Sequence, residues 1–316
     1  MNPHKAILIC GNAIAIPVLR DLVFHNQLAV LVIPKRQTAF VEEVQQLLKG
    51  SNIPVVIVAA EDFVISIQQA IQQYQPAIGF VFTCSYKIPK EVYSLLEKGF
   101  YNIHPGPLPA YRGPDPVFQQ IKNREPYAAI TIHQLDDGFD SGPIVLSNKI
   151  RLSVTDTYGM VVKNLGELAS QTVSTVMKMA SFGVNIPSRQ QDHSKAVFYK
   201  KQSKASITIN WQTMDAPTIV ALVNACNPWN KGAVTSLNQN IIRLLEATAT
   251  ENGIPGENDN DQRGTILSID ATGMKVATVA GSVVVRLIYC NEGFLSADRL
   301  LTFGVQPGVM FSTLPV

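Results

Sequence analysis

The N-terminal third of the sequence alternates continuously apolar segments with amphipathic ones, and this alternation restricts the fold more than any other feature. The apolar segments have the length of β-strands and cover 5–10, 28–33, 53–58 and 77–83. Each is followed by residues whose apolar positions recur at helical spacing. A strand that is apolar on both sides must be covered on both faces, as in a parallel sheet flanked by helices. The sequence therefore predicts an α/β fold with a doubly wound, mostly parallel, Rossmann-like sheet, whose ligands bind at the carboxyl ends of the strands.

A different pattern follows position 125. Segments 127–135 and 142–152 read as two strands separated by the acidic turn DDGFDS, so they predict an antiparallel pair. Residues 155–180 have the apolar spacing of a long amphipathic helix. The periodicity fails between about 183 and 205, where the composition is typical of a linker.

From 206 onwards the sequence predicts a second unit. A helical segment precedes short strands that end at glycines and recur at regular intervals, which is typical of a small β-barrel of the OB-like kind. The expected organisation is an N-terminal α/β domain over 1–185, a linker over 186–205 and a C-terminal β-barrel domain over 206–316.

The composition is that of a globular protein without a strong overall charge. Hydrophobic residues make up 46% and charged residues 16%, which excludes a disordered chain. The formal net charge of +2 is too small to indicate nucleic acid by itself. We expect a cytoplasmic protein with no membrane partner, because no stretch reaches the length of a membrane span and no signal cleavage pattern follows the first apolar run. The cysteines form no CxxC pair, which favours reduced core thiols over a metal site or a disulfide framework.

The segment YNIHPGPLPAYRGPDP, at 101–116, combines an amide and an imidazole with a high density of proline and glycine. It begins as the end of a strand, where side chains two residues apart point to the same face. Asn102 and His104 should therefore form one polar site, with Ile103 on the opposite face. The prolines that follow fix φ and should hold the loop in an extended form beside that site.

An acidic turn downstream supplies the carboxylates of Asp136, Asp137 and Asp140. A carboxylate beside an imidazole can fix its tautomer, and an asparagine amide can donate to an oxygen that becomes negative during acyl transfer. With Asp140 near His104, these side chains and Asn102 would make an acyl-transfer site that needs no covalent nucleophile. No Walker loop, zinc-ligand spacing or GxSxG elbow offers a competing chemistry.

Simpler interpretations exist for the same residues. An asparagine before a turn is usually a cap, and a histidine at a strand end is usually a satisfied structural residue. Asp136 and Asp137 fit a solvated hairpin turn, and His133 alternates within its segment as a structural residue would. On spacing alone, a structural role for Asn102 and His104 is therefore favoured over a catalytic one.

The combination NIHPGPLPAYRGPDP followed by GFDSGPI resembles the folate-dependent formyltransferases, which carry an asparagine, a histidine two residues later, a proline-rich loop and a downstream aspartate in a turn. The C-terminal stretches ITINW and ACNPWNKGAVTSLN resemble the barrel domain that follows the catalytic domain in methionyl-tRNA formyltransferases and some sugar formyltransferases. The resemblance covers nearly the whole chain. It implies a one-carbon transferase that uses 10-formyltetrahydrofolate as co-substrate and no metal, with its catalytic domain in residues 1–185.

The resemblance also implies roles for individual residues. Asn102 and His104 would polarise the formyl carbonyl and stabilise the tetrahedral oxyanion, and Asp140 would orient His104 and help to relay the proton of the attacking amine. The residues that it places against the folate are Thr83, Cys84, Ser85, Tyr86, Asp136, Asp137 and Gly138. The residues that it places near the acceptor are Gly106, Pro107, Leu108 and Arg112.

Two departures from the methionyl-tRNA enzymes of this family bear on the acceptor. The connection after the second strand is only PKRQTAF, whereas those enzymes carry a long basic insertion there. GPLP, at 106–109, replaces their Ser-Leu-Leu-Pro segment. We therefore expect N-formylation of a primary amine on a small molecule, such as an amino sugar nucleotide, an amino acid or a peptide intermediate.

Two alternatives stay open. The basic segment FYKKQSK, with Arg243 and Lys275, keeps formylation of methionyl-tRNA as the second hypothesis, which steep salt dependence of binding would distinguish. Hydrolysis of formyltetrahydrofolate by water is the third hypothesis. The C-terminal barrel argues against it, because such hydrolases do not usually carry one.

Overall fold

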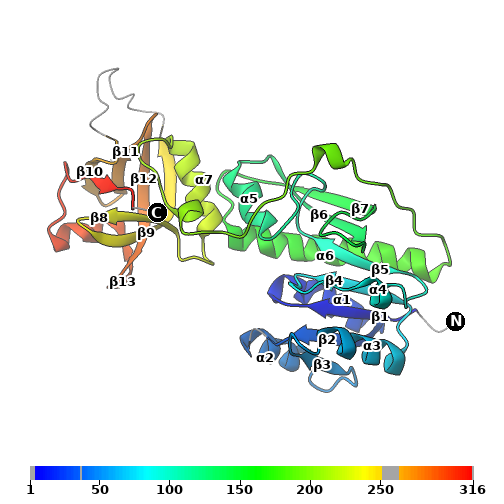
Figure 1. Cartoon of the computed structure of the whole chain (residues 1–316). Helices are drawn as coiled ribbons and strands as arrows, with labels where there is room; N and C mark the ends of the chain where they lie inside the picture. The colour runs from blue at the N-terminus through cyan, green and yellow to red at the C-terminus, as the bar shows by residue number, and fades with distance from the viewer. Residues whose placement is uncertain (1–3, 36–37, 251–262, 315–316) are drawn as a thin grey trace. The chain divides into compact units, whose positions relative to one another are not determined.

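The computed structural model of the chain describes residues 4–35, 38–250 and 263–314, and Figure 1 shows its ribbon. The chain forms two compact units. Unit 1 comprises Met1–Pro116, Tyr127–Arg151 and Val162–Tyr199, and unit 2 comprises Val117–Pro126, Leu152–Val161 and Lys200–Val316. Residues 186–199, predicted as part of a linker, thus belong to unit 1, and the predicted domain boundaries stay a prediction.

Unit 1 contains a seven-stranded sheet. Its strands are β1 (Ala6–Cys10), β2 (Leu28–Pro34), β3 (Val55–Val58), β4 (Ile78–Phe82), β5 (Phe100–His104), β6 (Tyr127–Gln134) and β7 (Ile144–Arg151). They pair in the order β3-β2-β1-β4-β5-β6-β7, in parallel from β3 to β5 and antiparallel for β6 and β7. The predicted doubly wound, mostly parallel sheet and its antiparallel pair are confirmed. Strand order reverses beside β1, which is where such sheets bind ligands.

Helices follow the parallel strands of this sheet (Figure 1). They are η1 (Ala13–Ala15), α1 (Ile16–Phe24), α2 (Thr38–Leu47), α3 (Phe63–Tyr74) and α4 (Lys90–Tyr93); the long helix α6 (Tyr158–Ser181) follows β7, and η2 (His193–Lys195) comes later. Helix α4 covers only the start of PKEVYSLLEKG (89–99), the segment in which the sequence predicts a helix. It ends early because the Leu95 N–H donates to the Val92 carbonyl three residues back, which tightens the chain into turns.

An apolar core lies between one face of the sheet and α3. Ile7 and Ile9 of β1 belong to it, together with Phe63 and Ile67 of α3, and all four side chains are buried. Burying each such side chain contributes about 1.5–3 kcal/mol relative to exposure. Leu8, which points to the other face, is buried as well. The strand β1 is therefore covered on both faces, as its continuously apolar sequence predicts.

Unit 2 contains a second sheet, which is antiparallel. Its strands are β8 (Ala233–Leu237), β9 (Asn240–Thr250), β10 (Ile266–Asp270), β11 (Gly273–Ala277), β12 (Ser282–Cys290), β13 (Gly293–Ser296) and β14 (Phe311–Ser312), and its helices are α5 (Pro116–Lys122), η3 (Ala205–Ile207), α7 (Ala216–Cys226) and η5 (Ala297–Phe303). The pairing order is β10-β11-β12-β9-β8-β14, with β13 beside β12. The Ile266 N–H donates to Val309 O and the Phe311 N–H to Gly264 O, so the sheet curves until its two ends meet. The predicted β-barrel is confirmed.

Trp211 lies in the interior of unit 2. Its side chain is buried, its Nε1 donates to Thr235 Oγ1 at 2.8 Å, and its ring stacks on Phe311 with centroids 5.4 Å apart. Gly264 lies against this ring with φ +88, a left-handed conformation that glycine adopts without strain. The indole therefore has both an apolar contact and a partner for its N–H, which is what a buried tryptophan requires.

We expect Trp211→Ala to lower the free energy of unfolding by about 3–5 kcal/mol, because it removes a fully buried aromatic ring. Trp229→Ala is the matched control, since Trp229 is 44% exposed and should cost clearly less. Urea unfolding followed by circular dichroism measures both changes. Equal losses in the two variants would contradict the assignment of Trp211 to the core.

Candidate active site

The strand β5 presents Asn102 and His104 on the same face, as predicted. Asn102 Nδ2 donates to Asp140 Oδ1 at 3.0 Å, and His104 Nδ1 lies 3.3 Å from the same oxygen. Ile103, between them, points away and is buried. Asp140 lies in the turn between β6 and β7, so the antiparallel pair returns this carboxylate to the carboxyl end of β5. The structure therefore brings together the three residues predicted to be catalytic.

Asp140 is held in place through both of its carboxylate oxygens. Oδ2 accepts a hydrogen bond from the Gly113 N–H at 2.9 Å, while Oδ1 faces β5. Its backbone has φ +53, in the left-handed region that few residues other than glycine, asparagine and aspartate adopt. Burial raises the pKa of Asp140, but attraction to His104 and hydrogen bonds from His104, His133 and the Gly113 N–H outweigh burial and hold the pKa well below its ordinary value. The carboxylate is therefore ionised near neutral pH.

The His104 imidazole is buried and contacts a different group through each nitrogen. Nε2 lies 2.6 Å from the Tyr111 carbonyl oxygen, which can only accept, so Nε2 carries a proton. Nδ1 faces the Asp140 carboxylate. Gly106 permits this approach of the loop, because a Cβ there would lie 3.0 Å from His104 Nε2. The two contacts thus fix the orientation of the ring, with Nδ1 in place to donate to Asp140.

The loop after His104 is not extended, and that prediction is wrong. The chain turns over residues 108–111, where the Ala110 N–H donates to Pro107 O at 3.1 Å. Tyr111 is buried after this turn, and its burial brings its carbonyl back to His104. Proline fixes φ only at its own position, so it does not prevent a turn elsewhere in the loop.

Residues predicted near the acceptor lie in and around this turn. Pro107 and Leu108 are half-buried, and Gly106 O accepts from Thr131 Oγ1 at 2.7 Å. Arg112 does not extend freely into solvent. Its Nη2 donates to Gln191 Oε1 at 2.7 Å and lies 3.1 Å from His193 Nδ1.

The two segments predicted to bind folate lie close together. Thr83, Cys84, Ser85 and Tyr86 follow β4 directly, and the Tyr86 ring packs on Phe63 with centroids 4.9 Å apart. Lys87 Nζ donates to Asp137 O at 2.6 Å, which ties this segment to the acidic turn.

Within the acidic turn the two remaining carboxylates have local partners. Asp136 Oδ1 accepts from the Gly138 N–H at 3.1 Å and from Ser141 Oγ at 2.8 Å. Asp137 Oδ1 accepts from Tyr93 OH at 3.3 Å. Hydrogen bonds therefore shape the turn, which is more than a solvated hairpin end.

Two residues of the site were missed by the sequence analysis. His133, interpreted as structural, lies with Nε2 3.1 Å from Asn102 Nδ2 and 3.6 Å from Asp140 Oδ1. It pairs directly with Asn102 across β5 and β6, so its place in the site depends on the register between these two strands. Gln191 donates from Nε2 to Asp140 O and to Gly142 O, at 2.9 and 2.7 Å. No periodic pattern marks it.

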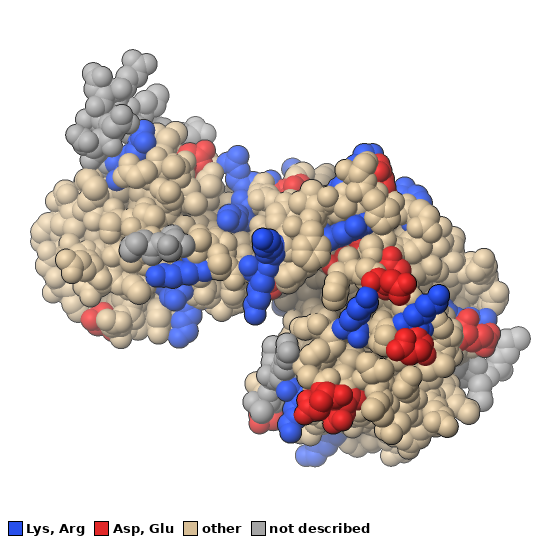
Figure 2. Space-filling model, in the orientation of Figure 1, with Lys and Arg blue, Asp and Glu red and all other residues tan. Residues whose placement is uncertain are grey.

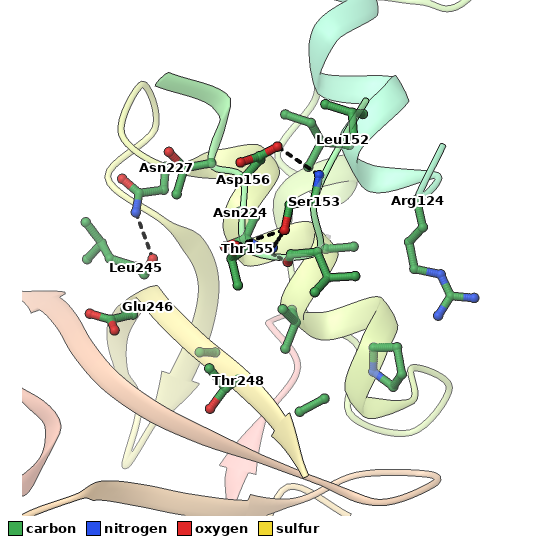
Figure 3. Close-up of a pocket in the computed structure, with 18 of the residues that line it drawn as sticks. Arg124, Leu152, Ser153, Thr155, Asp156, Asn224, Asn227, Leu245, Glu246 and Thr248 are labelled. Atoms are coloured by element: carbon green, nitrogen blue, oxygen red, sulfur yellow. Dashed lines mark hydrogen bonds between the residues drawn. The ribbon is translucent and has the colours of Figure 1, made fainter. Parts of the chain in front are cut away.

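A separate cavity of about 870 Å³ lies within unit 2 (Figure 3). Its walls are mostly apolar, with Arg124, Asp156 and Glu246 among the lining residues. Two amides close parts of the wall: Asn224 Nδ2 donates to Val154 O, and Asn227 Nδ2 donates to Leu245 O. None of the residues predicted for the active site lines this cavity.

Two further features concern metals and membranes. Within residues 4–35, 38–250 and 263–314 there is no group of three or more His, Cys, Asp or Glu side chains that could hold a metal ion. The helices in those ranges are all too short or too polar to cross a lipid bilayer.

The chain belongs to the formyl transferase family. Residues 6–177 match the formyl transferase family, and residues 201–293 match the formyl transferase C-terminal domain. The predicted resemblance, the enzyme class and the two-part architecture are confirmed.

Relatives in sequence include the methionyl-tRNA formyltransferases of Kosmotoga olearia and Stenotrophomonas maltophilia strain K279a. The first is 30% identical over 220 residues, which cover 70% of this chain and 68% of the relative. The second is 26% identical over 244 residues, which cover 75% and 77%.

Solved structures share the fold at lower identity. An N-formyltransferase from Helicobacter canadensis, in complex with folinic acid and dTDP-3-aminofucose, gives a TM-score of 0.67 at 15% identity, covering 89% of this chain and 98% of that one. HypX from Aquifex aeolicus, in complex with tetrahydrofolic acid, gives 0.63 at 18% identity and covers 94% of this chain. This chain spans 47% of the length of that HypX chain.

We expect the stabilising effect of the Asp140 carboxylate to disappear in acid. The pKa of Asp140 is lowered in the folded protein, so its contribution is fully present above the unfolded pKa of about 3.9 and is lost progressively as the pH falls from there towards the lowered pKa of the folded state. The difference in Tm between wild type and Asp140→Asn should therefore be largest at neutral pH, begin to shrink below about pH 4 and keep shrinking down to about pH 2.

Asp62→Asn is the control for this series, because Asp62 is exposed and its side chain caps no helix. Its Tm should follow that of the wild type at every pH. A constant difference for Asp140→Asn from pH 7 down to about pH 2 would show that the ionised carboxylate contributes nothing.

Proposed function

We propose that this protein transfers the formyl group of 10-formyltetrahydrofolate to a primary amine of a small molecule. The observation that carries the proposal is the convergence of Asn102 and His104 on one half-buried carboxylate, Asp140, at the carboxyl end of β5. This arrangement supplies an amide donor, an imidazole and a carboxylate beside one position, which is what non-covalent acyl transfer requires.

The proposed roles follow from the contacts of each group. The folate donor supplies an N-formyl carbon that an amine can attack, with a new C–N bond formed and the bond to the folate nitrogen broken. Asn102 Nδ2 is a hydrogen-bond donor next to His104, and it would turn one N–H from Asp140 Oδ1 to the developing oxyanion. The Asp140 carboxylate would take up the proton that the amine loses and pass it to the departing folate nitrogen. The His104 ring, held between Tyr111 O and Asp140, would polarise the formyl oxygen and help to stabilise the oxyanion.

The residues beside β4 fit a folate. Thr83–Tyr86 and the 136–138 turn both consist of irregular backbone, and the hydrogen bond from Lys87 to Asp137 O joins them. Irregular backbone offers N–H and C=O groups to the edge of a flat heterocycle such as a pterin. We propose that these two segments hold the donor and that the turn at 106–112 borders the acceptor.

The short connection between β2 and α2 supports a small acceptor. β2 ends at Pro34 and α2 begins at Thr38, which leaves no room for a long basic insertion. On the face of unit 1 drawn in Figure 2, acidic and basic side chains are interspersed. A polyanion would find no continuous basic surface there.

Methionyl-tRNA is the second candidate acceptor. Relatives that cover most of this chain carry that activity in their names. On the face of unit 2 drawn in Figure 2, the charged side chains are mostly basic. This surface is the feature that favours the second candidate.

The test measures the release of tetrahydrofolate from 10-formyltetrahydrofolate by absorbance, in parallel assays that each contain one acceptor. The acceptors are a panel of amino sugar nucleotides and amino acids, charged methionyl-tRNA, and buffer alone. We expect release with a small amine, at a rate that changes little between 50 and 200 mM salt. Release that needs tRNA and falls steeply with salt would overturn the proposed acceptor, and equal release in buffer would indicate hydrolysis.

We expect His104→Ala to lower kcat by roughly 10²–10⁴-fold, because it removes a positioned acid–base group. The affinity for the folate donor should stay nearly unchanged, since the proposed donor segments lie outside β5. Single-turnover kinetics and equilibrium binding measure the two effects.

His25→Ala is the control, because His25 caps the end of α1 and is exposed. Its activity should match the wild type. Near-normal activity in His104→Ala would exclude the imidazole from the reaction.

A further inference from the structure

Residues 186–199, which we call the strap, run along the active-site loops of unit 1. Arg189 exchanges two backbone hydrogen bonds with Ile144, each 2.8 Å long. Further on, the Val197 N–H donates to Pro109 O, and the Arg112 N–H donates to Val197 O. The Tyr199 ring stacks on Tyr111 with centroids 5.1 Å apart. The strap therefore contacts both the turn after His104 and the strand that follows Asp140.

Gln191 is the buried polar residue of the strap. Its side chain uses the whole amide: Nε2 donates to Asp140 O and Gly142 O, and Oε1 accepts from Arg112 Nη2. The orientation of the amide is fixed, because a flipped amide would place its oxygen against two carbonyls and its NH₂ against a guanidinium. Gln190, its neighbour in sequence, is exposed.

The two carbonyls that Gln191 binds belong to the turn that carries the Asp140 carboxylate. Asp140 is in the left-handed region, a conformation that its surroundings must maintain. At Gly142, a Cβ would collide with the Gln134 carbonyl, so the backbone there lies tightly against β6. Gln191 thus holds this turn from one side while β6 supports it from the other.

We propose that Gln191 is a positioning residue for formyl transfer. Its amide fixes the backbone of Asp140–Gly142, so that Oδ1 of Asp140 stays on Asn102 and His104 and Oδ2 stays on the Gly113 N–H. Arg112 orients the Gln191 amide in turn. This inference rests on the proposed catalytic role of Asp140, and it gives Arg112 a role other than direct binding of the acceptor.

Gln191→Met tests the proposal, because methionine keeps the volume and removes the hydrogen bonds. We expect kcat to fall about 10- to 100-fold, the usual effect of losing a group that orients a reacting one, while KM for the folate donor stays within about twofold. Gln191→Glu, which can still accept from Arg112 but cannot donate when ionised, should show the same fall. Gln190→Met is the matched control and should behave as the wild type.

A double-mutant cycle separates positioning from general loss of structure. If Gln191 acts through Asp140, Gln191→Met should cost little further activity in the Asp140→Asn background. Effects that multiply in the double variant, or a KM increase that accounts for the whole loss, would overturn the proposal.

An NMR measurement tests, without any turnover, whether Gln191 fixes the backbone of Asp140–Gly142. The Gly113 amide donates to Asp140 Oδ2, so its hydrogen exchange should accelerate at least tenfold in Gln191→Met and stay unchanged in Gln190→Met. Unchanged exchange in Gln191→Met would overturn the proposal. If the wild type transfers no formyl group while exchange responds as expected, Gln191 still fixes the backbone of Asp140–Gly142, and only the proposed function fails.

Discussion

The pairing of the largely buried Asp140 carboxylate with its hydrogen-bond donors is the interaction on which the candidate active site depends. A buried charge is costly unless it is paired and hydrogen-bonded, and here the partners come from separate parts of unit 1. β5 contributes Asn102 and His104, β6 contributes His133, and the loop after β5 contributes the Gly113 N–H. Each partner fixes the position of its own segment as well as the carboxylate. Neutralising this one group would therefore loosen several segments together.

The parts of the fold that could be predicted are those whose structure follows from the pattern of apolar residues within a single segment. β1 is apolar at every position because both of its faces are covered, and α6 repeats buried residues at helical spacing because one face is covered. The shared face of Asn102 and His104 follows from the two-residue period of a strand alone. The resemblance to the family rests on the combination of the motif NIHPG with the distant FDSG turn, which packing does not demand.

The missed features depend on contacts between segments far apart in the sequence. His133 joins the site through the register between β5 and β6, which the pattern of neither strand specifies. The strap has mostly exposed side chains, and its backbone hydrogen bonds go to the start of β7 and to irregular loops, so its sequence shows neither a helical nor a strand period. Gln191 meets Asp140 across 51 positions. The turn at 108–111 was missed because its proline content was taken to mean extension, whereas the burial of Tyr111 decides the path.

The division of the chain also sets an order on its assembly during synthesis. Residues 117–126 and 152–161 leave the ribosome early, yet their partners in unit 2 come much later: Lys122 Nζ donates to Ser206 O, and Val154 O accepts from Asn224 Nδ2. Chains emerge at roughly 5–20 residues per second, and non-local contacts form slowly. These early segments therefore remain without their partners for seconds. The Phe118 ring, for example, lacks the Trp229 ring against which it packs in the folded protein. A nascent chain of this protein therefore exposes apolar surface that favours aggregation until its C-terminal strands are complete.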